Sequence, residues 1–494
     1  MEKIERSLID ESKSTNEKLK VMGVAFIIGL LFNYFFIWNT IGISAVIYNG
    51  FIIAGAIWYL YPQIDLKKRI SFIFLIPIIL LSIAYSIYTN EILRLINTIV
   101  IPLLMASYII TIRYEHIKDI KFSFIEKVLV RIVPASFVNI PKFFVFTKKM
   151  ITSEKNSKVS EVHKNIFKGL IVALPLLLII VGLLSSADMV FEYYIDNMGK
   201  KLDLFSVIGH SMVVIITTLY MFGFLWSFQY KKELNTEKKS IQKNAIWEPV
   251  TIITIIFLIS IVYLLFTIIQ ISYLYGGGSD LLPGGLSHAA YARKGFFELI
   301  VVTLINFSIV LSSMTFSKKD NKNVNKIANG AYSLLILFTF NMLASASYKM
   351  MVYENKFGFT RLRLFVQVFM ILLAILLVII FLGIWIKKMP ILKLAIIATI
   401  TIYVGINFVN VDKVIAKNNI ERYKNRNVID MDYLESLSYD ATEEIGELMK
   451  IGDGNIKIRT IKYINRTVDE VDKSYNQWYE YNYYKHKILA VYKK

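Results

Sequence analysis

The sequence contains no cysteine, which excludes disulfide bonds, thiolate metal sites and cysteine nucleophiles. Its five histidines stand singly, without the spacing of a zinc-protease helix. The patterns GxxxxGK[ST], GxGxxG and GxSxG, which mark phosphate loops, dinucleotide folds and nucleophile elbows, do not occur. These absences argue against an ATPase, a zincin and an α/β-hydrolase, and we expect no cofactor and no metal.

Charged residues make up only 19% of the 494 residues, whereas hydrophobic residues make up 55% and the mean hydropathy is +0.53. The apolar residues form runs near the length at which a helix, rising about 1.5 Å per residue, crosses a hydrocarbon core about 30 Å thick. We therefore predict an all-α integral membrane protein. About eleven transmembrane helices are expected, at 21–38, 42–61, 71–88, 92–112, 167–186, 206–229, 248–273, 296–316, 328–348, 364–386 and 391–409.

The basic residues predict the orientation of these helices. With a cytoplasmic N-terminus, the inner connections hold 31 Lys and Arg and the short outer ones only 8, as the positive-inside rule requires. The net charge of +19 is then explained by basic residues that set the topology and contact the lipid bilayer, so no nucleic acid partner is expected. The predicted organisation is a cytoplasmic N-terminus (1–20), a four-helix membrane region (21–112), a basic cytoplasmic loop (113–166), a seven-helix membrane region (167–409) and an extracytoplasmic, mainly helical C-terminal domain (410–494).

The cytoplasmic loop 113–166 is not uniformly polar. Apolar residues recur at helical spacing around Lys127 and Arg131, which predicts an amphipathic helix on the inner leaflet. A docking site for a protein partner, through this loop or through the C-terminal domain, is an alternative use of the same surfaces.

Ionisable residues are scarce at mid-depth in the predicted helices, which disfavours a proton-coupled pump built on a central carboxylate. Amides remain, and such groups usually bond from helix to helix rather than to a substrate. We therefore expect helix-to-helix bonds at Asn97, Asn306, Asn341, Gln367 and Asn407.

Two outer segments carry candidate functional residues. In the first, Tyr291 and Glu298 share one face of a helix start, with Arg293 between them; an interfacial aromatic belt with one charge reaching water explains the same pattern. The second, 353–363, contains positive charge on the outer side against the topological trend, which suggests a carboxylate or anionic ligand nearby. Its residues of interest are Tyr353, Gly358 as a turn, Thr360 as a helix cap, Arg361 and Arg363.

The C-terminal domain contains a third segment of interest. Asp440 and Glu443 have the spacing of a capping box, and Gly452 and Gly454 are placed to end the helix that it would start. Asp430 and Asp432 are also interpreted as helix caps, because their spacing is not that of a calcium loop.

At these three segments the sequence resembles bacterial multi-pass membrane proteins of the domain-of-unknown-function family forty-one seventy-three, a sister of forty-one fifty-three. The resemblance rests on the run from Tyr291 to Leu299, on Tyr353 with Gly358, Thr360 and Arg363, and on tail residues that include Asp432, Asp440, Trp478 and Asn482. His288 and Ala290 depart from the family pattern. The resemblance implies a multi-pass protein of the bacterial plasma membrane and implies no reaction.

Three classes of function stay open. A small-solute transporter or channel component is favoured by the number of helices, ahead of an outward-facing sensor or accessory subunit and of an enzyme acting at the outer leaflet. No catalytic residue is assigned, and the balance leans against an enzyme. We expect one outer-face site, with Glu298 paired to Arg361 or Arg363 and the region Asp430–Asp440 closing over it.

Overall fold

The structure is a computed structural model. It describes residues 13–61, 63–67, 69–114, 120, 122–153, 204–230, 247–270, 296–317, 322–386, 388–474 and 477–493, with short stretches between 177 and 191.

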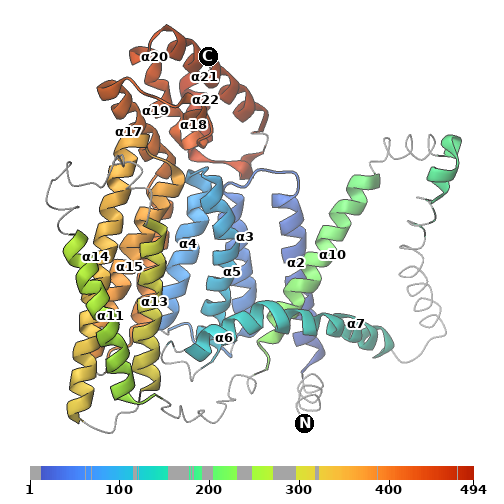
Figure 1. Cartoon of the computed structure of the whole chain (residues 1–494). Helices are drawn as coiled ribbons and strands as arrows, with labels where there is room; N and C mark the ends of the chain where they lie inside the picture. The colour runs from blue at the N-terminus through green and yellow to red at the C-terminus, as the bar shows by residue number, and fades with distance from the viewer. Residues whose placement is uncertain are drawn as a thin grey trace.

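The described residues are almost entirely helical, and ten helices among them are long and apolar enough to cross a membrane. The all-α membrane fold is thereby confirmed. All but one of these ten helices run upright in Figure 1, as does α3 (Ser44–Leu60), which is apolar but shorter. The other upright helices are α2 (Thr15–Phe36), α4 (Phe72–Ile87), α5 (Glu91–Arg113), α10 (Leu204–Ser227), α11 (Pro249–Gln270), α13 (Phe296–Phe316), α14 (Lys322–Phe357), α15 (Arg361–Trp385) and α16 (Ile391–Phe408).

Most of these helices match the predicted spans within a few residues. The helix predicted at 328–348 is the exception, because α14 covers 36 residues and is about 54 Å long, well beyond an apolar core of about 30 Å. An apolar run in the sequence indicates only the part of a helix that lies within the membrane. The prediction therefore missed the polar turns at both ends of α14. The helix predicted at 167–186 lies mostly outside the described residues.

One of the ten apolar helices, Ser123–Lys148, falls inside the loop predicted to be amphipathic. It consists of α6 (Phe122–Val130), a π-helical stretch η2 (Arg131–Ala135) and α7 (Ser136–Ser153). Figure 1 shows these segments running across the lower end of the upright helices rather than parallel to them. This is the arrangement expected for a helix on a membrane surface.

The buried apolar residues form three clusters. The first joins α2–α5 and α10, and the second joins α11, α13, α14 and α15. Helix α16 contacts both α4 and α15 and so connects the two groups. The membrane region therefore consists of two helix bundles, each with its own core.

The third cluster lies in the C-terminal segment after residue 409, here called the tail. In Figure 1 the tail covers the end of the bundle opposite the start of α2. Its helices are α17 (Val411–Arg426), α18 (Met431–Glu435), η6 (Tyr439–Ala441), α19 (Thr442–Gly446), α20 (Leu448–Ile451), α21 (Gly454–Ser474), η7 (Trp478–Glu480) and α22 (Tyr483–Tyr492).

The predicted caps in the tail are partly wrong. Asp430 does cap α18, and Gly452 does end α20. Asp440 and Glu443 form no capping box: α19 begins without a side-chain cap, and Glu443 accepts instead from Lys487 at 2.7 Å. Asp432 is not a cap either, because it pairs with Arg459. In both cases the side chain bonds to a residue distant in sequence instead of capping the helix beside it.

Candidate functional site

Arg94 organises the end of the membrane region on which the tail lies. Its guanidinium donates to the carbonyl oxygens of Ile41 at 2.9 Å, Tyr85 at 2.7 Å and Tyr88 at 3.0 Å. These carbonyls belong to the loop before α3 and to the end of α4, so one side chain connects α5 to both of these neighbours.

Asp412 lies in the first turn of α17 and is fully buried. Its carboxylate accepts two hydrogen bonds of 2.7 Å from Arg361, one of 3.0 Å from the Asn90 amide and one of 3.1 Å from the Ser438 backbone N–H. Because Asn90 caps α5 and Arg361 begins α15, this carboxylate connects both helix bundles to the tail.

Asp440 lies close by and is also buried. It accepts from the Thr89 backbone N–H at 2.8 Å and from the Thr89 hydroxyl at 2.6 Å. Burial raises the pKa of this carboxyl to about 6, and the charge of Asp412 acts in the same direction, against the hydrogen bonds from Thr89. We call Thr89, Asn90, Arg361, Asp412 and Asp440 the tail junction.

The last part of the tail attaches separately to the N-terminal bundle. Glu480, 3% exposed, accepts from the backbone N–H of Thr40 at 2.7 Å, and the Asn482 amide donates to the Tyr85 carbonyl at 3.0 Å. A Cβ at Gly42 would come within 2.4 Å of the Glu480 carbonyl oxygen, so only glycine permits this contact. The tail is therefore fixed to the membrane region at two places.

The structure brings together only part of the predicted outer-face cluster. Tyr291 and Arg293 lie outside the described residues. Glu298 is in the first turn of α13 and interacts electrostatically with Lys349 of α14. The described residues include no ion pair between Glu298 and either arginine, so that predicted pairing is wrong; the carboxylate partner of Arg361 is Asp412.

The loop before α15 was predicted more accurately. Gly358 has a positive φ of 87°, as a tight turn requires, and the Thr360 hydroxyl accepts from the Arg363 backbone N–H to cap α15. The Arg363 guanidinium lies 4.4 Å from the ring centre of Tyr353. The Tyr433 hydroxyl accepts from the Arg361 backbone N–H at 2.7 Å, so the Asp430–Asp440 region contacts this loop, without the Glu298 pair over which it was predicted to close.

The intramembrane amides bond between helices, as predicted. Asn97 donates to Asn407 at 2.8 Å, and Asn306 donates to Thr339 at 3.0 Å. The Ser347 hydroxyl is 3.0 Å from the Gln367 amide oxygen.

A cavity of about 470 Å³ lies within the N-terminal bundle. Its wall combines many apolar side chains with a few polar ones, drawn mainly from α2, α3, α5 and α10. No sequence pattern indicated it, because its lining comes from helices up to about 190 residues apart. The lining includes Phe32, Phe36, Tyr48, Asn49, Ile52, Asn97, Ile101, Met105, Ile216, Tyr220 and Phe224.

The part of the chain that the structure describes contains no group of three or more His, Asp or Glu side chains that could hold a metal ion. The polar side chains of the tail junction instead satisfy one another through hydrogen bonds. The arrangement is suited to holding the tail on the bundle.

A family model described as "Domain of unknown function (DUF4153)" matches residues 75–448, well over half of the chain. The chain belongs to this family. The sequence analysis had placed it in the sister family, forty-one seventy-three, and that assignment is corrected here. No curated protein and no solved structure matches the chain significantly.

The matched region of this DUF4153 protein contains all five residues of the tail junction. The second attachment, at Glu480 and Asn482, lies beyond it. Asp412 and Thr89 were missed by the sequence analysis because a polar residue beside an apolar run is ordinarily a helix cap.

Proposed function

We propose that this protein is a transporter for a small apolar or amphipathic solute, with the cavity of the N-terminal bundle as its binding site. The cavity is the observation that carries the proposal. Its volume of about 470 Å³ falls within the range of about 300–1,000 Å³ typical of small-molecule sites, which are mostly apolar with a few polar groups.

The lining favours an apolar solute because several of its polar groups are already engaged. The Asn49 amide donates to Ser82 at 2.8 Å, and the Tyr220 hydroxyl donates to the Ile132 carbonyl at 3.2 Å. Asn97 is bonded to Asn407. A strongly hydrated solute would lose its water without gaining equivalent partners.

The division of the membrane region supports transport over static binding. The two bundles have separate cores and are connected by α16 and by the tail junction. Separate packed bodies with few connections are able to move relative to each other, as alternating access requires.

An accessory or sensing subunit is the second candidate. It is favoured by Asp412, which receives hydrogen bonds from both bundles and from the tail. Any displacement of the tail would therefore disturb hydrogen bonds to both bundles. An outer-leaflet enzyme gains no comparable support, since Glu298 does not pair with the arginines.

We place the protein in the bacterial plasma membrane, with the N-terminus in the cytoplasm and the tail outside. The distribution of basic residues supports this orientation. The position of α6 and α7, across the end of the bundle away from the tail, agrees with a basic loop on the cytoplasmic leaflet (Figure 1).

Binding of a solvatochromic apolar dye to the purified protein tests the proposed site. Ile216 lines the cavity and is 66% exposed, so Ile216→Trp should block the opening and abolish saturable binding. Ile215 is the preceding residue of α10, is 57% exposed and does not line the cavity, so Ile215→Trp is the matched control. Equal binding by both variants would exclude this cavity.

Dye entry into proteoliposomes then separates the two candidate functions. A transporter should accelerate dye entry, and Ile216→Trp should remove the acceleration. Saturable binding without accelerated entry would instead favour the sensing or accessory role.

A further inference from the structure

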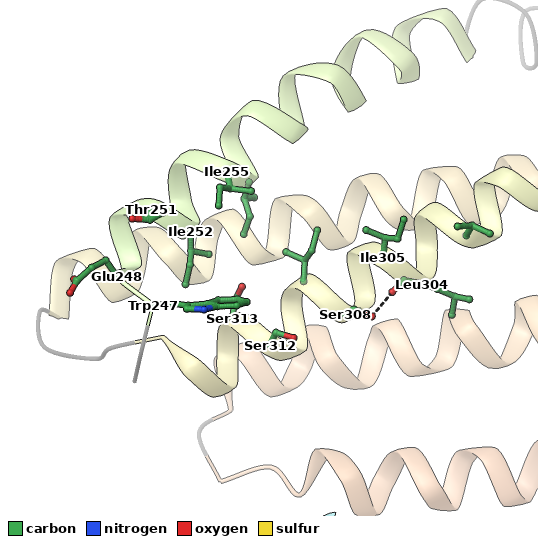
Figure 2. Close-up of a pocket in the computed structure, with 13 residues that line it drawn as sticks. Trp247, Glu248, Thr251, Ile252, Ile255, Leu304, Ile305, Ser308, Ser312 and Ser313 are labelled. Atoms are coloured by element: carbon green, nitrogen blue, oxygen red, sulfur yellow. Dashed lines mark hydrogen bonds between the residues drawn. The ribbon is translucent and has the colours of Figure 1, made fainter. Parts of the chain in front are cut away.

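A second hollow lies in the other bundle, between α11 and α13. Both helices pack on α14 but make few contacts with each other, so a groove of about 740 Å³ opens between them. Figure 2 shows Ile255 of α11 and Leu304 and Ile305 of α13 along it. Both isoleucines are about half exposed, which leaves apolar surface uncovered inside the membrane region.

The length of the groove matches one leaflet of a bilayer. Its lining on α13 extends from Val301 to Ser313, which corresponds to about 18 Å along the helix axis. Half of an apolar core about 30 Å thick is about 15 Å. An acyl chain entering from one membrane surface would therefore fill the groove and reach roughly the bilayer centre.

The polar end of the groove lies at the membrane boundary. Trp247, just before α11, lies there beside Ser313 near the end of α13 (Figure 2). Tryptophan is typical of the lipid headgroup level, where its ring is buried and its N–H finds a polar partner. Ser313 is 1% exposed, and its hydroxyl has no hydrogen-bond partner among the described residues.

An unpaired buried hydroxyl is costly in a medium without water, and a lipid ester oxygen beside it would satisfy it.

We propose that the groove between α11 and α13 holds one acyl chain of a phospholipid from the leaflet at the Trp247 end. The chain lies against Ile255 and Ile305, and the Ser313 hydroxyl donates to an ester oxygen of the glycerol region. This site is separate from the cavity of the N-terminal bundle and does not depend on transport.

Native mass spectrometry of the full chain tests the proposal. The protein is reconstituted in vesicles of phosphatidylethanolamine and phosphatidylglycerol with identical acyl chains and then extracted into detergent. We expect one phospholipid per chain to stay bound after the surrounding lipid is removed.

Two tryptophan variants of α11 provide the matched comparison. Ile255→Trp fills the groove and should lose the retained lipid, whereas Leu258→Trp, at a position 60% exposed and outside the groove, should keep it. Ser313→Ala removes a single oxygen that has no partner among the described residues, so we expect an intact fold and a several-fold lower lipid occupancy.

Two outcomes would overturn the proposal. Absence of any retained lipid excludes a site, and equal retention by both tryptophan variants indicates surrounding lipid only. Size-exclusion elution and the helical circular dichroism of each variant identify those that have failed to fold, and Ser313→Ala then decides.

Discussion

The guanidinium of Arg361 and the carboxylate of Asp412 form two parallel hydrogen bonds of 2.7 Å each, 51 residues apart in sequence. The aspartate is fully buried and the arginine side chain is 19% exposed. Paired planar geometry of this kind is among the strongest polar contacts in proteins. Here it fixes the first turn of the tail to the start of α15.

Removal of Asp412 should release the tail. Asp412→Ala leaves Arg361 and Asn90 without their acceptor, and we expect a loss of stability of about 3 kcal/mol, the lower part of the range for breaking a buried pair. Limited proteolysis of the protein in detergent should show faster cleavage within the tail.

Lys413→Ala is the matched control for this experiment. Lys413 is the next residue and pairs with Glu443 and Glu444 at the surface, where such pairs contribute about 0–1 kcal/mol. Similar cleavage rates for both variants would show that the Asp412 pair does not hold the tail in place.

Acidification should stabilise the docked tail through Asp440. Its pKa is about 6 in the folded protein and near the ordinary value of 3.8 when unfolded, so the folded protein binds the proton more tightly. The contribution of Asp440 to the free energy of unfolding therefore rises as the pH falls through 6, by about 1 kcal/mol between pH 7 and pH 5.

The pH dependence is measured as the midpoint of thermal unfolding at pH 7 and pH 5, in the protein and in Asp440→Asn. In the protein, protonation of Asp440 should raise the unfolding midpoint at pH 5 relative to pH 7. Asp440→Asn cannot titrate, so its midpoints should lack this contribution. Burial lowers the pKa of Lys485 to about 8, so this lysine stays protonated in both states across the window and adds no slope. An unchanged slope in the variant would contradict the assignment.

A side chain at Gly358 should strain the turn before α15. Its φ of 87° disfavours every residue with a Cβ, and a Cβ there would lie 2.7 Å from the Asn419 amide oxygen. We expect Gly358→Ala to destabilise the protein by about 1–2 kcal/mol in thermal unfolding.

Gly330→Ala provides the comparison for that measurement. Gly330 lies within α14, and an added Cβ would meet no atom within 4 Å. Alanine should therefore be neutral or stabilise the helix by up to about 1 kcal/mol. If both alanine variants behave alike, backbone strain at Gly358 is not the cause.

Reporter fusions test the orientation. An enzyme that works only outside the cytoplasm should be active when fused after Lys494, and a cytoplasmic reporter should be silent there. Fusion within the 231–246 connection should give the opposite result, because that segment is predicted to be inside. The reverse pattern at either place would show that the positive-inside assignment is wrong.

The sequence predicted the loop before α15 better than it predicted the partners of that loop. Gly358 and Thr360 act through their own backbone neighbourhood, so a turn and a cap follow from residue type and spacing. The partner of Arg361 does not follow from spacing, because several carboxylates were equally available and only packing of the tail brings Asp412 beneath it. The same holds for Asp440, whose sequence context indicated a cap and whose actual donor is Thr89, 351 residues away.

By itself, the sequence determined that this is an all-α membrane protein, and it determined where most of the helices lie. This was possible because the bilayer imposes one length and one polarity on each crossing helix, and both are readable within about twenty consecutive residues. The tertiary structure decided which residues and helices are neighbours. Examples are the pairing of Arg361 with Asp412, the cavity of the N-terminal bundle and the groove between α11 and α13. In lipid, helices associate by shape and by scattered polar contacts rather than by hydrophobicity, so no periodic pattern in the chain records which faces meet.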